Sequence, residues 1–436
     1  MFGLFLELGP FYFDAASRAT EDYNKTGVPT MWRNPYAWTN VANVLIINSP
    51  PPVGYSYCDP DGPTGKGYSC GNWNDSRTSY HNQQYLENWA RAFPEYAQVG
   101  KTEWYLVGES YAGVYVPTLV RRILQDDTSN VRPLLRGMAI GDGCVGTEVL
   151  CGPSNGPFHY LKFMNGHGQF ADKLWNGIMA ACPMQNLTDG SSPPTGECKA
   201  LIGKVGAQLG GYFAYNLYDT CWYQNSFNPH PHSLEAALGA RRAWGPPPKD
   251  AVERAEREHA KKNNAHVRVT GLGGAENDYP CGGPGALFEW VQTAPVKAAL
   301  HVAPDAYFFS GDDGVGFNYT VSEPNLLPFY AYLNENAEKL NFRTLVYNGD
   351  TDPAINSFAA QNWTVALGFD EKQSWRPWTL DGKQYMGGYV TRYEGSFDFL
   401  TIRGSGHMVP EYKPKPALEF LSKWLANEDW LPYVKA

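Results

Sequence analysis

Three short motifs carry side chains that together could perform nucleophilic catalysis. They are G-E-S-Y-A-G at residues 108–113, N-G-D-T-D-P at residues 348–353 and G-S-G-H-M-V-P at residues 404–410. A serine hydroxyl needs a base that removes its proton, and an imidazole base needs a carboxylate that fixes its tautomer. The sequence therefore predicts a triad of Ser110, His407 and one of two aspartates, Asp350 or Asp352.

Each motif alone is a weak signal. A G-x-S-x-G pattern arises easily in a chain with 45 glycines, an aspartate after a strand is usually a turn or cap residue, and a histidine between small residues usually lies in an exposed loop. The three motifs nevertheless each follow a predicted strand, where open α/β sheets place their sites. Their order, serine then aspartate then histidine, is the α/β-hydrolase order.

The segments between the motifs alternate between strands and helices, which indicates an α/β fold with a mostly parallel sheet flanked by helices. Apolar runs predict strands at residues 44–47, 104–107, 138–141, 342–347 and 397–402, and apolar periodicity predicts helices at 79–93, 116–123, 325–340 and 416–425. The run at 44–47 is expected to be buried on both faces of the sheet. Pro117 is expected in the first turn of its helix.

The rhythm of strands and helices fails between residues 147 and 290. This segment contains five of the eight cysteines and the run Pro246-Pro247-Pro248. We therefore expect one catalytic domain formed by residues 1–146 and 291–436, with a cap-like insertion at 147–290. Within the insertion, the mixed charges of residues 249–262 indicate a solvated helix or a mobile loop.

Composition excludes several classes of protein. A net charge of −9 and a pI near 5.5 leave no basic stripe for a nucleic-acid partner. No apolar run is long enough to span a bilayer, so we expect no membrane span. The cysteines lie at no metal-ligand spacing, and we expect neither a metal nor a cofactor.

The cysteines and five N-x-S/T sequons favour the secretory route. The cysteines are Cys58, Cys70, Cys144, Cys151, Cys182, Cys198, Cys221 and Cys281, and the candidate glycosylation sites are Asn24, Asn74, Asn186, Asn318 and Asn362. Disulfides and surface glycans both belong to an oxidising compartment. The final address stays open between the lysosome or vacuole and the outside of the cell.

Taken together, the three motifs resemble the serine carboxypeptidase family. The resemblance extends to residues 3–10, 38–49 and 53–57, which match segments of that family in the same order. It implies an α/β-hydrolase that removes residues from peptide or protein C-termini, with Asp352 in the triad and Asp350 in a structural role. The backbone N–H of Tyr111, directly after the serine, is expected to be an oxyanion donor.

The resemblance also implies a substrate-binding pair, Glu7 and Glu109, and places Met408 near the leaving residue. An exopeptidase must recognise the free carboxylate beside the scissile bond. Because two close carboxyls cannot both ionise cheaply, one is expected to keep its proton and to donate a hydrogen bond to that carboxylate. Activity is therefore expected to favour acidic pH.

The chain departs from the family pattern at its start. The family carries N-G-G-P-G-C-S-S just before the stretch matched by residues 3–10, and this segment supplies a second oxyanion N–H and an asparagine. Its absence here predicts an N-terminally truncated and weakly active chain, and one of the eight cysteines is expected to lack a partner. Residues 1–10 are accordingly not interpreted as a signal peptide.

Two other functions stay open. Some members of the family are acyltransferases, in which an alcohol accepts the acyl group in place of water. A catalytically silent binding protein is the third possibility, although three triad candidates and both glutamates are present. The sequence indicates neither the residue preference nor the oligomeric state.

Overall fold

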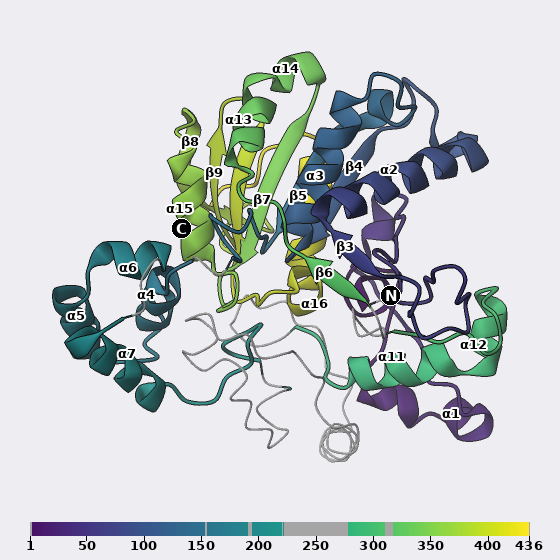
Figure 1. Cartoon of the computed structure of the whole chain (residues 1–436), viewed down its shortest axis with the longest axis horizontal. Helices are drawn as coiled ribbons and strands as arrows, with labels where there is room; N and C mark the ends of the chain where they lie inside the picture. Colours follow the sequence, from purple (N-terminus) through teal and green to yellow (C-terminus); the bar gives the residue numbers. More distant parts are fainter. Residues whose placement is uncertain are drawn as a thin grey trace.

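The centre of the protein is a six-stranded sheet (Figure 1). The computed structural model describes residues 2–152, 155–190, 194–219, 221, 278–309 and 317–435. In spatial order the strands are β4 (Trp104–Glu109), β5 (Leu135–Gly141), β7 (Arg343–Gly349), β10 (Phe397–Ile402), β9 (Met386–Tyr393) and β8 (Glu371–Thr379). The first four are parallel, and β9 and β8 add an antiparallel hairpin. The expected mostly parallel α/β sheet is confirmed.

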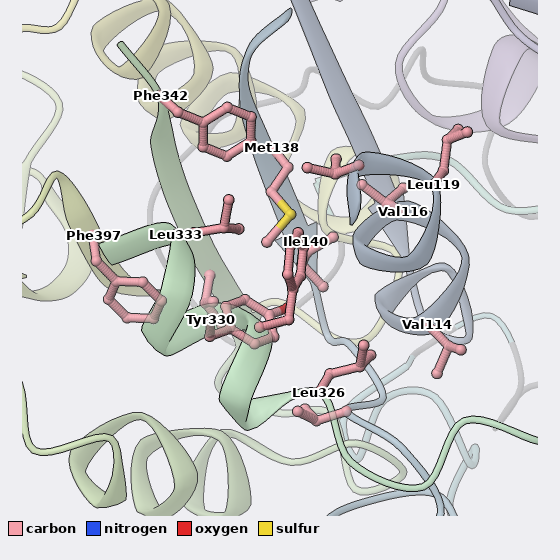
Figure 2. Close-up of a cluster of buried hydrophobic side chains, with 14 of the residues drawn as sticks. Val114, Val116, Leu119, Met138, Ile140, Leu326, Tyr330, Leu333, Phe342 and Phe397 are labelled. Atoms are coloured by element: carbon pink, nitrogen blue, oxygen red, sulfur yellow. The ribbon is translucent and has the colours of Figure 1, made fainter. Parts of the chain in front are cut away.

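Helices cover both faces of this sheet. In β7, Leu345 and Tyr347 face one apolar cluster while Val346 faces another, because successive side chains of a strand point to opposite faces. One face packs against α2 (Asp75–Ala92), α3 (Ala112–Gln125), α13 (Leu327–Glu335) and α15 (Ser357–Ala366), and the other against α17 (Pro414–Leu425). Figure 2 shows the cluster on the face covered by α2, α3, α13 and α15, where side chains of α3, β5 and α13 meet.

Short helices and strands lie between the elements of this core. They are η1 (Gly3–Glu7), β1 (Phe11–Tyr12), η2 (Ala15–Arg18), α1 (Glu21–Thr26), β2 (Trp32–Arg33), η3 (Trp38–Asn40), β3 (Asn72–Asn74), η4 (Pro94–Tyr96), η5 (Arg132–Leu134), α12 (Ala294–Ala299), β6 (Asn318–Thr320), α14 (Ala337–Leu340) and α16 (Val409–Tyr412). The carboxyl ends of β4, β5, β7 and β10 lie at one edge of the sheet, because parallel strands share a direction.

Three local predictions were wrong. The helix expected at 325–340 is divided into α13 and α14 at Asn336. Pro117 lies inside α3 rather than in its first turn, because α3 already begins at Ala112, right after the serine motif. Residues 44–47 form no strand in the described structure. Their apolar side chains are satisfied by packing instead, since Val44 and Ile47 contact the two clusters on the two faces of the sheet.

The described helices of the expected insertion lie in two places (Figure 1). Its first helices, α4 (Phe158–Gly166), α5 (Asp172–Ala181), α6 (Met184–Asp189) and α7 (Gly196–Gln208), share their own apolar cluster. The later helix α11 (Gly283–Gln292) packs with Phe5, Leu6 and Phe13 near the start of the chain. The division into a catalytic domain and an insertion stays a prediction, and residues 249–262 lie outside the described structure.

All eight cysteines form disulfides, so the expectation of an unpaired cysteine was wrong. The pairs are Cys58–Cys70, Cys144–Cys151, Cys182–Cys198 and Cys221–Cys281. Each pair joins cysteines that are neighbours in sequence order, and three of the four loops are short. Among the described helices, none combines the length and apolar character that crossing a membrane requires.

Gly349, at the end of β7, lies where the two loops that follow β7 and β10 approach each other closely. A Cβ atom at this position would lie 2.1 Å from the Gly406 carbonyl oxygen, which is backbone and cannot rotate away. We expect Gly349→Ala to lower the free energy of unfolding by about 1–3 kcal/mol or more, measured by urea denaturation. Gly203→Ala is the control, because Gly203 lies in α7 facing open space. Equal destabilisation by both variants would contradict this packing.

Candidate active site

Ser110 lies in a sharp turn between β4 and α3. Its φ of 64° is in the left-handed region, which costs a residue with a side chain about 1–3 kcal/mol. Backbone hydrogen bonds hold this conformation: the Ser110 N–H donates to the Gly141 carbonyl at 2.9 Å, and the Ser110 carbonyl accepts from the Cys144 N–H at 3.0 Å. A Cβ at Gly113 would lie 2.3 Å from the Cys144 carbonyl oxygen, so the motif needs glycine there.

Asp352 and His407 lie together beyond the ends of β7 and β10. The His407 Nδ1 atom is 2.7 Å from the Asp352 Oδ2 atom, and both side chains are almost completely buried. The Asp352 carboxylate also accepts hydrogen bonds from the N–H groups of Ala354 and Ile355 at 2.8 and 3.2 Å. His407 Nε2 is buried and makes no hydrogen bond within the described residues, so it is available to a hydroxyl.

Residues 213–217 belong to the expected insertion and lie against the two loops that carry this pair. The Tyr215 ring stacks on the His407 imidazole with centroids 4.6 Å apart, and the Tyr215 carbonyl accepts from the backbone N–H of His407 at 2.7 Å. On the other side, Asn216 accepts from the Thr351 hydroxyl at 2.9 Å. The segment therefore contacts the loop of the histidine and the loop of the aspartate at once.

Glu7 and Glu109 belong to a group of buried or half-buried carboxyls. Glu7 ends η1, which contacts α16, and Glu109 ends β4. Burial raises the pKa of Glu7 to about 7, against the opposing attraction of His407. The pKa of Glu109 is raised well above its usual range by burial first and then by the carboxyls of Glu7, Glu411 and Asp352.

Glu411, in α16, is a third member of this group that the sequence did not suggest. Its side chain is buried, and burial followed by the nearby carboxyls of Glu7 and Asp219 raises its pKa well above the usual range. The only available signal was its position four residues after His407. Close, poorly solvated carboxyls favour protonated forms, so this group can offer O–H donors at acidic pH.

The Tyr111 side chain is fixed by a hydrogen bond to a residue outside the serine motif. It is the N-cap of α3, where backbone N–H groups have no partner within the helix. Its hydroxyl donates to Asp75 at 2.8 Å, and Asp75 also accepts from the Tyr319 hydroxyl and from the N–H groups of Ser322 and Glu323. Asp75 therefore anchors Tyr111, and no motif had pointed to it.

The remaining predicted site residues lie as follows. Asp350 accepts from the Gly404 N–H at 2.6 Å and joins the loops of the aspartate and the histidine, and its pKa is raised by burial to about 6. Met408 is half-buried next to His407. Of the sequon asparagines, Asn24, Asn318 and Asn362 are exposed, whereas Asn74 and Asn186 are partly buried.

Comparison with known proteins gives one consistent result. The family model described as serine carboxypeptidase matches residues 1–427. A serine carboxypeptidase of Caenorhabditis elegans, ctsa-4.1, is 32% identical, covering 98% of this chain and 81% of the relative. The lysosomal protective protein of Mus musculus is 30% identical, covering 98% and 82%. Serine carboxypeptidase 1 of Hordeum vulgare is 27% identical, covering 98% and 80%.

A solved structure has a similar fold. It is Kex1(delta)p, described as a prohormone-processing carboxypeptidase from Saccharomyces cerevisiae, with a TM-score of 0.62 and 17% sequence identity. The match covers 98% of this chain and 80% of that chain. At this identity the likeness supports the α/β-hydrolase fold and no finer feature.

The raised pKa of Glu7 predicts a dependence of stability on pH. Between the ordinary value of 4.5 and the folded value of about 7, the folded state binds more protons than the unfolded state. The stability that this proton contributes is present below the ordinary value and is lost as pH rises through about 7. We expect the melting temperature to fall over this interval, and Glu7→Gln to reduce the fall.

The control is Glu21→Gln, because Glu21 is exposed on α1. Differential scanning calorimetry at several pH values measures the slope for all three proteins. If the melting temperature of Glu7→Gln falls with rising pH as steeply as that of Glu21→Gln, the raised pKa of Glu7 is contradicted.

Proposed function

The chain belongs to the serine carboxypeptidase family, and from this membership we propose that Ser110, Asp352 and His407 catalyse removal of single residues from peptide C-termini. The observation that carries the proposal is the buried 2.7 Å contact between His407 and Asp352, at the same sheet edge as the strained Ser110 turn. A strained serine at the same sheet edge as an oriented histidine fits the arrangement that acyl transfer requires.

In the proposed mechanism, His407 Nε2 takes the proton of the Ser110 hydroxyl as its oxygen attacks the scissile carbonyl. Asp352 holds the imidazole through Nδ1 and stabilises its charged form. The backbone N–H of Tyr111 donates to the oxyanion. His407 then protonates the leaving amine, the C–N bond breaks, and the C-terminal residue departs. Water, deprotonated by His407, hydrolyses the acyl-enzyme and restores Ser110.

Selection of the C-terminus is assigned to Glu7 and Glu109. A deprotonated pair would repel the terminal carboxylate of a substrate, whereas a protonated carboxyl donates a hydrogen bond to it. Burial raises the pKa of both groups, which supports binding on the acidic side of neutrality. The half-buried Met408 is proposed to contact the leaving residue and to favour apolar ones.

Among the alternatives, the acyltransferase differs only in the acceptor of the acyl group. The family match and the printed descriptions of the relatives favour hydrolysis. A silent binding protein is disfavoured by the oriented histidine, since a site without chemistry has no need to bury that pair.

Passage through the secretory route is proposed on the four disulfides, which form in oxidising compartments. One relative is described as lysosomal, and for this chain a lysosomal, vacuolar or extracellular address is proposed. Glycosylation is proposed first at the exposed Asn24, Asn318 and Asn362. Peptide or protein C-termini are the proposed substrates.

The test is release of the C-terminal residue from an N-blocked dipeptide at acidic and neutral pH, followed by mass spectrometry. We expect release to be faster at acidic pH. Ser110→Ala should lower it by about 10³-fold or more, because removing the nucleophile leaves only binding and oxyanion stabilisation. Ser129→Ala, a buried serine away from the site, is the matched control. An added alcohol that captures the acyl group without hydrolysis would favour the acyltransferase instead.

A further inference from the structure

Asp142 is a buried carboxyl that the mechanism above does not use. It follows β5 directly, at the sheet edge where Ser110, Asp352 and His407 follow their own strands. Its side chain is completely buried, and its φ of 41° is in the left-handed region that disfavours residues with side chains. A buried acid in such a conformation is held by specific contacts.

Those contacts fix both the backbone and the carboxyl. The Asp142 N–H donates to the Tyr347 carbonyl at 2.8 Å. The carboxyl accepts from the Gly349 N–H at 3.0 Å and from the Asn348 side-chain amide at 3.2 Å. Asp142 is therefore fastened to the end of β7, three residues before Asp352.

The contacts also bring Asp142 to the triad. A carboxylate oxygen of Asp142, one of Asp352 and a ring nitrogen of His407 all lie within 4.8 Å of one another. In a buried site two negative charges this close would be costly, so one of the two carboxyls favours its protonated form. A protonated carboxyl has an O–H donor, which a carboxylate lacks.

Of the two, Asp352 has the contacts that suit a carboxylate. It accepts two backbone N–H groups and faces His407, which becomes a cation during catalysis. We propose that Asp142 carries the proton and donates a hydrogen bond to Asp352, as a positioning residue that holds the carboxylate against His407. This inference deepens the proposed function and rests on it.

The electrostatic surroundings of Asp142 agree with this assignment. Its pKa is raised well above the usual range, first by burial and then by the charges of Asp352 and Glu109, while the Gly349 N–H acts in the opposite direction. The titratable groups around it are Glu109 at the end of β4, Tyr347 in β7, and Asp352 and His407 in the two catalytic loops. The neighbouring carboxyls act against ionisation of Asp142.

A pH-dependent activity follows. The protonated Asp142 supports the triad, so the reactivity of Ser110 should fall as rising pH removes that proton. Asparagine is nearly isosteric and its amide N–H₂ can donate to Asp352 at any pH, whereas alanine provides no donor. The two substitutions therefore separate the donor from the charge.

The experiment measures the rate at which a fluorophosphonate labels Ser110 in the full chain, from acidic to alkaline pH. This readout needs no peptide and no carboxylate recognition. We expect Asp142→Ala to slow labelling by about tenfold or more, the worth of a hydrogen bond to a charged group. Asp142→Asn should label at a rate close to that of the unchanged protein at acidic pH and should lack its alkaline decline. The control is Asp398→Asn, because Asp398 is a buried acid that pairs with Arg392 away from the site. Labelling of this variant should still slow at alkaline pH.

Circular dichroism at each pH restricts the rates to folded protein. Loss of folding in Asp142→Ala would leave the comparison between Asp142→Asn and the unchanged protein decisive. Equal slowing in the asparagine and alanine variants, or an alkaline decline that persists in Asp142→Asn, would overturn the proposed donor while leaving the triad intact. Failure of the unchanged protein to label at all would overturn both the donor and the proposed function.

Discussion

The crowding of carboxyl groups at one end of the sheet is the constraint on which the site depends. Glu7, Glu109, Asp142, Asp352 and Glu411 influence one another there, and all five are buried or half-buried. Ionising all of them would be prohibitive in a poorly solvated environment. The fold supplies N–H donors and a basic partner to Asp352, and burial favours the protonated forms of the other carboxyls. The proposed chemistry and the proposed preference for acidic pH both follow from that distribution of charge.

The sheet makes this crowding possible because it aligns strand ends that are far apart in the sequence. β4 ends in Glu109 and leads into the Ser110 turn, and β5, β7 and β10 lead to Asp142, Asp352 and His407. Backbone hydrogen bonds between these ends hold the strained conformations in place. Residues 213–217, which belong to the expected insertion, pack against the catalytic loops. The expected insertion therefore contacts the His407 imidazole directly.

Much of this was predictable from the sequence, and the exceptions have physical reasons. Apolar runs predicted four of the strands, and the motifs that follow three of them predicted the triad candidates, because burial and strand ends leave local signals. The run at 44–47 misled because apolar character reports burial but not hydrogen-bonded pairing. Asp142 was missed although it follows a predicted strand, since a single acid without a motif looks like a turn residue. Tyr215 and Asp75 reach the site only through tertiary contacts, which no local pattern encodes.

We propose that protonated carboxyls at this edge recognise the free C-terminus of the peptide that Ser110 attacks. The most direct measurement compares cleavage of one peptide in two forms, with a free terminal carboxylate and with a terminal amide, at acidic pH. We predict that kcat/KM for the free acid exceeds that for the amide by at least about tenfold, the worth of a charge-assisted hydrogen bond. Equal cleavage of the two forms, or preferential cleavage at an internal bond, would contradict it.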